Sequence, residues 1–334
     1  MKKREFNYSP TVVLERSCYY KNKTIMDHID NTYRIKNAKK SLLGVSIGDA
    51  FGDSFFGDLG KISESIYLRQ IPETKWEFTD DTVMSIAIFE ELERNGDINQ
   101  ENLLKQFCIN HDLDTNRGYG ATLRRLLREV QNGENWREVS KRAFDGQGSM
   151  GNGAAMRVCP IGAFHFDNFQ KVKELSIKSA EITHSNIEAI TGAIAIAIGT
   201  ALTTQMKLDR CILTPTDFID KILKELPDSD TKSKISKSKS VSYNYHIDTV
   251  KSILGNGLNM TAQDTVPFAI WCTAYNLQNF EEGLWKAVSI LGDRDTICAI
   301  VGGMSIMSSD DLNIPYSWTN SVESIDKSIF RRNE

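Results

Sequence analysis

The chain has 334 residues, of which 40% are hydrophobic and 25% are charged, and its formal net charge is −4. This length allows one large domain or two ordinary ones, and the composition is typical of a globular protein that buries a substantial core. The acidic balance argues against a general nucleic-acid-binding surface, because phosphate binding needs a basic field.

Cysteine usage and apolar runs limit the cellular setting. The six cysteines are scattered and form no C-x-x-C pair, which leaves zinc and dithiol chemistry without support. We therefore expect reduced thiols in a cytoplasmic protein. No apolar region of a signal peptide follows the basic N-terminus. The longest apolar run, Ile190–Leu202, is short for a membrane span, so we expect a buried core helix and no membrane association.

Residues 1–35 are polar and lack sustained periodicity, so they are predicted to form an N-terminal extension, either a partly ordered tail or a partner-binding arm. From Asn37 onward helical periodicity dominates, and strand patterns with hairpin turns are almost absent. Residues 36–334 are therefore predicted to form one all-α domain. Its expected helices are Ala38–Ala50, Thr82–Leu92, Glu101–Cys108, Ala121–Val130, Trp136–Phe144, Phe169–Ile182, Asn186–Thr204, Phe218–Leu226, Ala262–Tyr275, Phe280–Leu291 and Thr296–Met307. The polar stretch Pro227–Ser242 is expected to be a solvated loop or a charged helical connector.

Two acidic segments stand at the starts of predicted helices: Thr79-Asp80-Asp81 and Asp293-Arg294-Asp295-Thr296. Each is explained most simply as a helix cap, since such side chains accept hydrogen bonds from unpaired N–H groups and complement the helix dipole. One cap needs one acceptor, however, and each segment offers three oxygen-bearing side chains. Carboxylates gathered in one place repel one another unless a cation lies between them. If the segments meet, they suit hard ions such as Mg2+ or Mn2+.

A glycine-rich segment, Gly146–Arg157, lies between the two acidic segments. Small residues let backbone N–H groups approach a ligand, and a following helix N-terminus attracts phosphate. The alternative is a plain flexible connection before a helix. The segment is not a P-loop, because no G-K-[ST] sequence ends it.

Three smaller features have simple structural explanations as well. Gly44–Gly52 carries small residues along one helix, as close helix packing requires. Arg117-Gly118-Tyr119-Gly120 is a turn with an aromatic side chain, which is either a loop or a platform for a base. The single histidine of Thr183-His184 is more typical of a structural role than of catalysis.

Taken in chain order, these segments resemble the ADP-ribosylglycohydrolase family, which includes dinitrogenase reductase-activating glycohydrolase and the ADP-ribosylarginine hydrolases. The matching segments are Gly48–Gly52, Phe78–Thr82, Arg117–Gly120, Gly151–Arg157, Thr183-His184 and Gly292–Thr296. They extend from about residue 38 to residue 308. Each motif alone is weak, whereas the ordered set is specific.

The resemblance implies a compact orthogonal helical bundle with two Mg2+ ions, sometimes Mn2+. The implied metal ligands are Thr79, Asp80, Asp81, Asp293, Asp295 and Thr296. ADP-ribose would place its distal ribose on the metals, and Asp80 or Asp81 would act as general base toward water. The implied ligand-binding residues are Asp49, Gly118, Tyr119, Ser149, Met150, Gly151, Asn152, Gly153, Ala154 and His184. Of these, residues 149–154 would cradle the diphosphate, and Tyr119 and His184 would line the nucleotide pocket.

The chain departs from the family pattern at two positions. Many relatives carry a glutamate shortly after the G-D-x-x-G motif, where this chain has Phe56; this weakens the case for a serine-linked substrate. Asp53 or Asp58 is a candidate to replace that glutamate. In the second acidic segment, Arg294 stands where a small or polar residue is common.

The resemblance leads to one main hypothesis and two alternatives. The main hypothesis is a Mg2+-dependent hydrolase that removes ADP-ribose from a modified protein side chain, most often arginine. The first alternative is an immunity protein that neutralises an ADP-ribosyltransferase toxin by binding it through residues 1–35. The second is a protein that binds ADP-ribose without cleaving it, which the phenylalanine at position 56 suggests.

Overall fold

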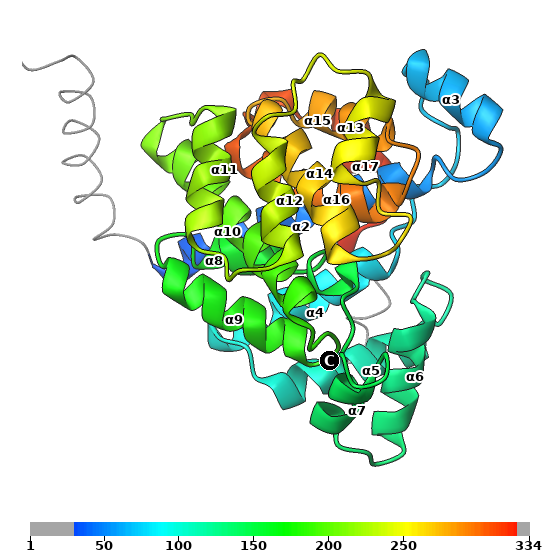
Figure 1. Ribbon diagram of the computed structural model, residues 1–334, viewed down its shortest axis with the longest axis vertical. Helices are drawn as coiled ribbons and strands as arrows, with labels where there is room; N and C mark the ends of the chain where they lie inside the picture. Colours follow the sequence, from blue (N-terminus) through cyan, green and yellow to red (C-terminus); the bar gives the residue numbers. More distant parts are fainter. Residues whose placement is uncertain (1–29, 326–334) are drawn as a thin grey trace, which may run out of the picture.

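The computed structural model describes residues 30–325 and confirms the predicted all-α fold in that range (Figure 1). Residues 30–325 contain no β-strand and only two isolated bridges, Trp76 with Val322 and Gly151 with Thr261. The α-helices are α2 (Asn31–Asp53), α3 (Leu59–Tyr67), α4 (Asp80–Asn95), α5 (Gln100–Leu113), α6 (Ala121–Gln131), α7 (Trp136–Arg142), α8 (Cys159–Phe164), α9 (Phe169–Glu181), α10 (Ile187–Asp209), α11 (Pro215–Lys224), α12 (Asp230–Ser238), α13 (Ile247–Leu254), α14 (Ala262–Tyr275), α15 (Phe280–Val288), α16 (Arg294–Ser308) and α17 (Tyr316–Ser321). Two short 3-10 helices, η1 (Asn152–Ala154) and η2 (Asp311–Asn313), complete the set.

Helices α2 and α16 form the centre of the molecule and have the most extensive mutual contact of any helix pair described (Figure 1). Glycines allow their backbones to touch. A methyl group added at Gly48 would fall on the carbonyl oxygen of Cys298, and one added at Gly302 would fall on the carbonyl oxygen of Gly44. The small residues along α2 therefore have the close-packing role that the sequence indicates.

Helix α10 is the described helix that is long and apolar enough to cross a membrane, but 83% of its apolar window is buried inside the protein. It packs against α8, α9, α14 and α16. This burial agrees with the core helix expected for Ile190–Leu202. Helices α5, α6 and α7 gather at one end of the molecule, and α4 lies between them and the central helices (Figure 1).

Some boundaries differ from the predicted ones for local physical reasons. Helix α2 begins at Asn31 because Asp30 caps it, so the end of the predicted extension is helical; residues 1–29 lie outside the described range. Helix α7 ends at Arg142, since Phe144 and Asp145 adopt positive φ angles. The polar stretch after Pro227 contains α12, whose first N–H groups donate to the carboxylate of Glu188.

The contact between α2 and α16 is tested by Gly302→Ala. We expect this change to lower the free energy of unfolding by about 2 kcal/mol or more, because the methyl group forces the two backbones apart. Gly283→Ala in α15 is the matched control, since its nearest neighbours lie at an ordinary 3.4 Å and 3.5 Å. Urea unfolding followed by circular dichroism measures both. Equal effects of the two variants would contradict the packing argument.

Candidate active site

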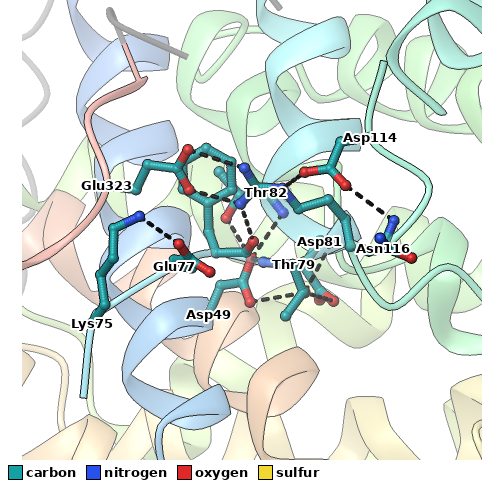
Figure 2. A network of polar contacts seen from close by, with 11 residues as sticks. Asp49, Lys75, Glu77, Thr79, Asp81, Thr82, Asp114, Asn116 and Glu323 are labelled. Atoms are coloured by element: carbon teal, nitrogen blue, oxygen red, sulfur yellow. Dashed lines mark hydrogen bonds and ion pairs between the residues drawn. The ribbon is translucent and has the colours of Figure 1, made fainter. Parts of the chain in front are cut away.

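The carboxylate of Asp49, on α2, is fully buried and holds the start of α4 (Figure 2). Its Oδ2 atom accepts hydrogen bonds from the N–H groups of Thr79 (2.9 Å) and Thr82 (3.0 Å) and from the hydroxyl of Thr82 (2.6 Å). Its Oδ1 atom accepts one from the hydroxyl of Thr79 at 2.9 Å. Asp49 thereby satisfies N–H groups that a helix N-terminus leaves unpaired. Its role in the structure is to position α4.

A second set of contacts, made by Arg117, holds the same segment. Arg117 donates to the carbonyl oxygen of Phe78 at 2.8 Å, and its own carbonyl accepts from the N–H of Asp80 at 2.6 Å. The guanidinium also pairs with Asp114 and with Glu323 near the end of the described chain (Figure 2). The backbone around Asp80 is therefore fixed by groups from three distant parts of the sequence.

The two acidic segments meet in space. The hydroxyl of Thr296, on α16, donates to Oδ2 of Asp81 at 3.3 Å, and the hydroxyl of Thr79 lies 3.2 Å from the same oxygen. Asp81 is only 2% exposed. The starts of α4 and α16, more than 200 residues apart in sequence, thus form one oxygen-rich cluster.

Helix capping explains only part of this cluster. The hydroxyl of Thr79 does cap α4, since it accepts from the N–H of Asp81 at 3.3 Å. Asp293 stands at the cap position of α16 but makes no capping hydrogen bond. Its carboxylate instead accepts from the side-chain amide of Asn152 at 2.6 Å, which links the glycine-rich segment to the acidic cluster.

Burial and mutual repulsion raise the pKa values of the carboxyl groups in this cluster. Removal from water, followed by repulsion from Asp295, raises the pKa of Asp49 to about 7, against hydrogen bonds from Thr82 and Thr79 that lower it. The same two causes, with the charge of Asp49, raise the pKa of Asp80 to about 8. Burial and neighbouring carboxylates also raise the pKa values of Asp81 and Asp293 well above the ordinary range. Without a positive partner, negative charge here is unfavourable.

The residues of the cluster fit a hard cation by donor type. Oδ1 of Asp81 and Oδ1 of Asp295 are buried and have no hydrogen-bond partner within the described chain. Carboxylate and hydroxyl oxygens are the donors that Mg2+ and Mn2+ prefer. Among residues 30–325, no three Asp, Glu, His or Cys side chains already converge as a ready metal-binding group. Holding an ion therefore requires the carboxylates to turn toward a common point.

A cavity of about 560 Å³ opens beside the cluster. Its wall contains most of the predicted site residues: Asp80, Asp81, Gly118, Ser149, Met150, Gly151, Asn152, Gly153, His184, Asp293, Asp295 and Thr296. Thr79 and Asp49 do not line the cavity. Thr79 contacts Asp81 of the wall, and Asp49 in turn holds Thr79. One concave site thus unites five segments of the chain.

Besides Asp49, two predicted ligand-binding residues, Tyr119 and Ala154, do not line the cavity. Tyr119 is 4% exposed, and its ring packs edge-on against His111 with 5.0 Å between the centroids. Gly118, with φ of 87°, turns the chain so that the glycines on either side of Tyr119 face the cavity instead. Ala154 is fully buried in the core.

The glycine-rich segment is held in place by the segment before α14. The N–H of Asn152 donates to the carbonyl of Met260 at 3.0 Å, and the carbonyl of Met150 accepts from the N–H of Ala262 at 2.9 Å. The N–H of Gly151 donates to Oγ of Ser149 at 3.2 Å. Two of the backbone donors predicted to cradle a ligand are therefore already used within the protein.

Sequence reasoning missed the apolar part of the cavity wall. Phe144 is 56% exposed and Met260 67% exposed, and both adopt positive φ angles that turn them out of regular structure. The other missed lining residues are Met84, Gly120, Ala121, Thr122, Leu123, Met156, Thr183, Asn259 and Thr261. The polar, glycine-containing stretch 255–259 ahead of a predicted helix was an available signal for the Met260 loop; nothing in the pattern distinguished Phe144.

The two positions that depart from the family pattern contact each other. The guanidinium carbon of Arg294 lies 4.3 Å from the ring centroid of Phe56, and Arg294 is only 4% exposed. Of the two nearby aspartates, Asp58 caps α3 by accepting from the N–H of Lys61 at 3.0 Å. Asp53 is exposed and follows Gly52, where an added methyl group would lie 2.8 Å from the Cα atom of Asp295. Burial, followed by the charges of Asp295 and Glu77, raises the pKa of Asp53.

Comparisons with known proteins agree on one family. The ADP-ribosylglycohydrolase family model matches residues 30–331. The chain is 26% identical over 330 residues to ADP-ribosylhydrolase ARH3 of Xenopus tropicalis, covering 86% of this chain and 91% of that protein. It is 27% identical over 157 residues to ADP-ribosyl-[dinitrogen reductase] glycohydrolase of Rhodospirillum rubrum, covering 44% of this chain and 50% of that protein. A solved ADP-ribosylglycohydrolase-related protein complex has the same fold, with a TM-score of 0.62 at 20% identity over 87% of this chain and 94% of that one.

The buried acidic cluster generates a stability prediction for the metal-free protein. Because the pKa of Asp80 is raised from 3.8 to about 8, its contribution to stability is lost as the pH rises through that window. We expect Asp80→Asn to raise the Tm of the metal-free protein by several degrees at pH 8 and to change it little at pH 4. The variant should also lose the rise in Tm that Mg2+ gives the wild type.

Glu64→Gln, on the exposed side of α3, is the matched control and should keep the full response to Mg2+. Differential scanning calorimetry with EDTA or with Mg2+ measures all three proteins. A metal-free Asp80→Asn protein that is less stable than the wild type at pH 8, or that still responds to Mg2+, would contradict this reading of the cluster.

Proposed function

The chain belongs to the ADP-ribosylglycohydrolase family and is thus a hydrolase of ADP-ribosylated substrates, and from that premise we propose that it is Mg2+-dependent and removes ADP-ribose from modified arginine side chains. The observation that carries the proposal is the meeting of Asp81 and Thr296 at one end of the cavity. The cavity volume, about 560 Å³, lies in the range of sites that enclose small ligands.

The proposed mechanism assigns one task to each group of residues. Asp80, Asp81, Asp293 and Asp295 would hold the ions, together with the hydroxyl oxygens of Thr79 and Thr296. Bound Mg2+ supplies Lewis acidity, orients hydroxyls of the ribose and lowers the pKa of an associated water. Asn152 keeps the carboxylate of Asp293 turned toward the site, and Asp49 keeps the start of α4 in place.

Both Asp80 and Asp81 lie in the cavity wall, and Asp80 is the better placed general base because it is the less buried of the two. In the proposed step it accepts a proton from water while the water oxygen bonds to the anomeric carbon of the ribose. The bond from that carbon to the guanidinium nitrogen breaks, and the nitrogen leaves with the bonding electron pair and takes up a proton. The transition state has oxocarbenium character, as in other glycoside hydrolysis.

The surroundings of Phe56 support arginine as the modified residue. A guanidinium leaving group is positively charged once protonated, so an acidic entrance favours it. Asp53 is an exposed carboxylate next to Gly52, whose backbone packs against Asp295. The ring of Phe56 lies over the guanidinium of Arg294, so this position carries an apolar side chain and no carboxylate. The position that carries a catalytic glutamate in some relatives thus holds an apolar cover in this chain.

The proposal is tested by release of ADP-ribose from arginine-modified and from serine-modified protein, each with Mg2+ and with EDTA. We expect release from the arginine-modified protein only, and only with Mg2+. Chromatography of the released nucleotide measures the product. Equal release with EDTA would contradict the metal dependence, and faster release from the serine-modified protein would contradict the linkage. Binding of ADP-ribose without release from either would show that the chain binds but does not cleave.

The role of Asp53 is tested by Asp53→Asn with Asp58→Asn as its control. We expect Asp53→Asn to lower kcat/KM for the arginine-modified protein by about tenfold, equivalent to ~1.4 kcal/mol, because it removes an exposed carboxylate beside the acidic cluster. Asp58→Asn should leave kcat/KM nearly unchanged, since Asp58 caps α3. Steady-state kinetics measure both variants. A larger loss of kcat/KM in Asp58→Asn than in Asp53→Asn would contradict the role proposed for Asp53.

A further inference from the structure

Arg157 is a buried cation that has no part in the mechanism above. It is fully buried, and its guanidinium carbon lies 4.8 Å from the ring centroid of Phe107. It donates to the carbonyl oxygen of Ser179 at 2.6 Å, to the hydroxyl of Ser179 at 3.2 Å and to the hydroxyl of Thr183 at 2.9 Å. An arginine withdrawn from water in this way is costly and needs these acceptors. One of these acceptors, the hydroxyl of Thr183, also contacts His184, which lines the cavity.

The hydroxyl of Thr183 connects Arg157 to His184. Its oxygen accepts from Arg157, which has donors only. Within residues 30–325, the other polar atom that contacts this hydroxyl is Nδ1 of His184, at 2.6 Å. The hydroxyl proton therefore satisfies a hydrogen bond only if Thr183 donates it to Nδ1. Because Nδ1 is then the acceptor, a neutral imidazole carries its proton on Nε2.

The Nε2 atom faces the glycine-rich wall of the cavity. A methyl group added at Gly151 would lie 3.0 Å from Nε2, and one added at Gly153 would lie 3.2 Å from it. The absence of side chains at these two positions lets the ring lie flush against the loop. His184 and both glycines line the same cavity, so a proton on Nε2 is available to a ligand there.

We propose that Arg157 and Thr183 form a relay that fixes His184 as its neutral Nε2–H tautomer, so that His184 offers the ligand a hydrogen-bond donor and not a base. Arg157 and Thr183 are positioning residues, since they act through His184. The relay itself is independent of the ligand; the identification of that ligand as ADP-ribose, with its acceptor oxygens, rests on the function proposed above. Burial and the positive charge of Arg157 lower the pKa of His184 to about 3, which agrees with a neutral ring.

The tautomer is observable without any ligand. Nitrogen NMR of the histidine-labelled full chain distinguishes a protonated from a bare ring nitrogen, and His184→Gln identifies the signals among those of five histidines. We expect a protonated Nε2 and a bare Nδ1 in the wild type. Thr183→Val removes the hydroxyl at nearly constant shape and should give a mixture of tautomers, whereas Thr183→Ser should keep the wild-type pattern. A proton on Nδ1 in the wild type overturns the proposal, whatever the stability of the variants.

Calorimetric titration with ADP-ribose then measures the effect on binding. We expect Thr183→Val to weaken binding about tenfold, the worth of one hydrogen bond, and Thr183→Ser to stay within about twofold of the wild type. Unchanged tautomer and unchanged affinity in Thr183→Val would overturn the relay. If the wild type shows the expected tautomer but does not bind ADP-ribose, the relay stands and the proposed function fails.

Discussion

Several carboxyl groups withdrawn from water in one place are the constraint on which this structure depends. Burial raises the pKa values of Asp49, Asp80, Asp81 and Asp293, and each charge raises those of its neighbours. Gathering these carboxyl groups lowers the stability of the metal-free protein, because buried unpaired charge is costly. The arrangement is favourable once positive charge lies among them, which is why we read the cluster as a cation site.

The rest of the architecture serves to hold that cluster. Glycines let α2 and α16 approach closely, so that Asp49 and Thr296 both contact the start of α4. Arg117 fixes the backbone ahead of α4, and Asn152 ties the glycine-rich segment to Asp293. The cavity is therefore walled by rigid helix starts and short loops that support one another. Such support is what a site needs to keep its geometry when a ligand enters.

Much of this was predictable from the sequence, and the exceptions have physical reasons. Helical periodicity predicts the helices that bury an apolar face. Helix α12 is polar, and its contact with Glu188 is not indicated by any local sequence pattern. Redundant oxygens at two helix starts indicate a site, but only the fold shows that Asp81 and Thr296 meet. Phe144 was predicted as the last residue of a helix. Its positive φ angle depends on tertiary context, so the sequence pattern does not predict it. The family motif places Tyr119 in the pocket, whereas packing against His111 turns it away.

The central claim, that the two acidic segments share bound cations, is tested most directly by crystals of the full chain grown with Mn2+. Anomalous scattering locates Mn2+ without reference to any assumed chemistry. The account predicts anomalous density between the carboxylates of Asp81 and Asp295, within coordination distance of both. Anomalous density confined to other parts of the molecule, or its absence from the cluster at saturating Mn2+, would contradict it.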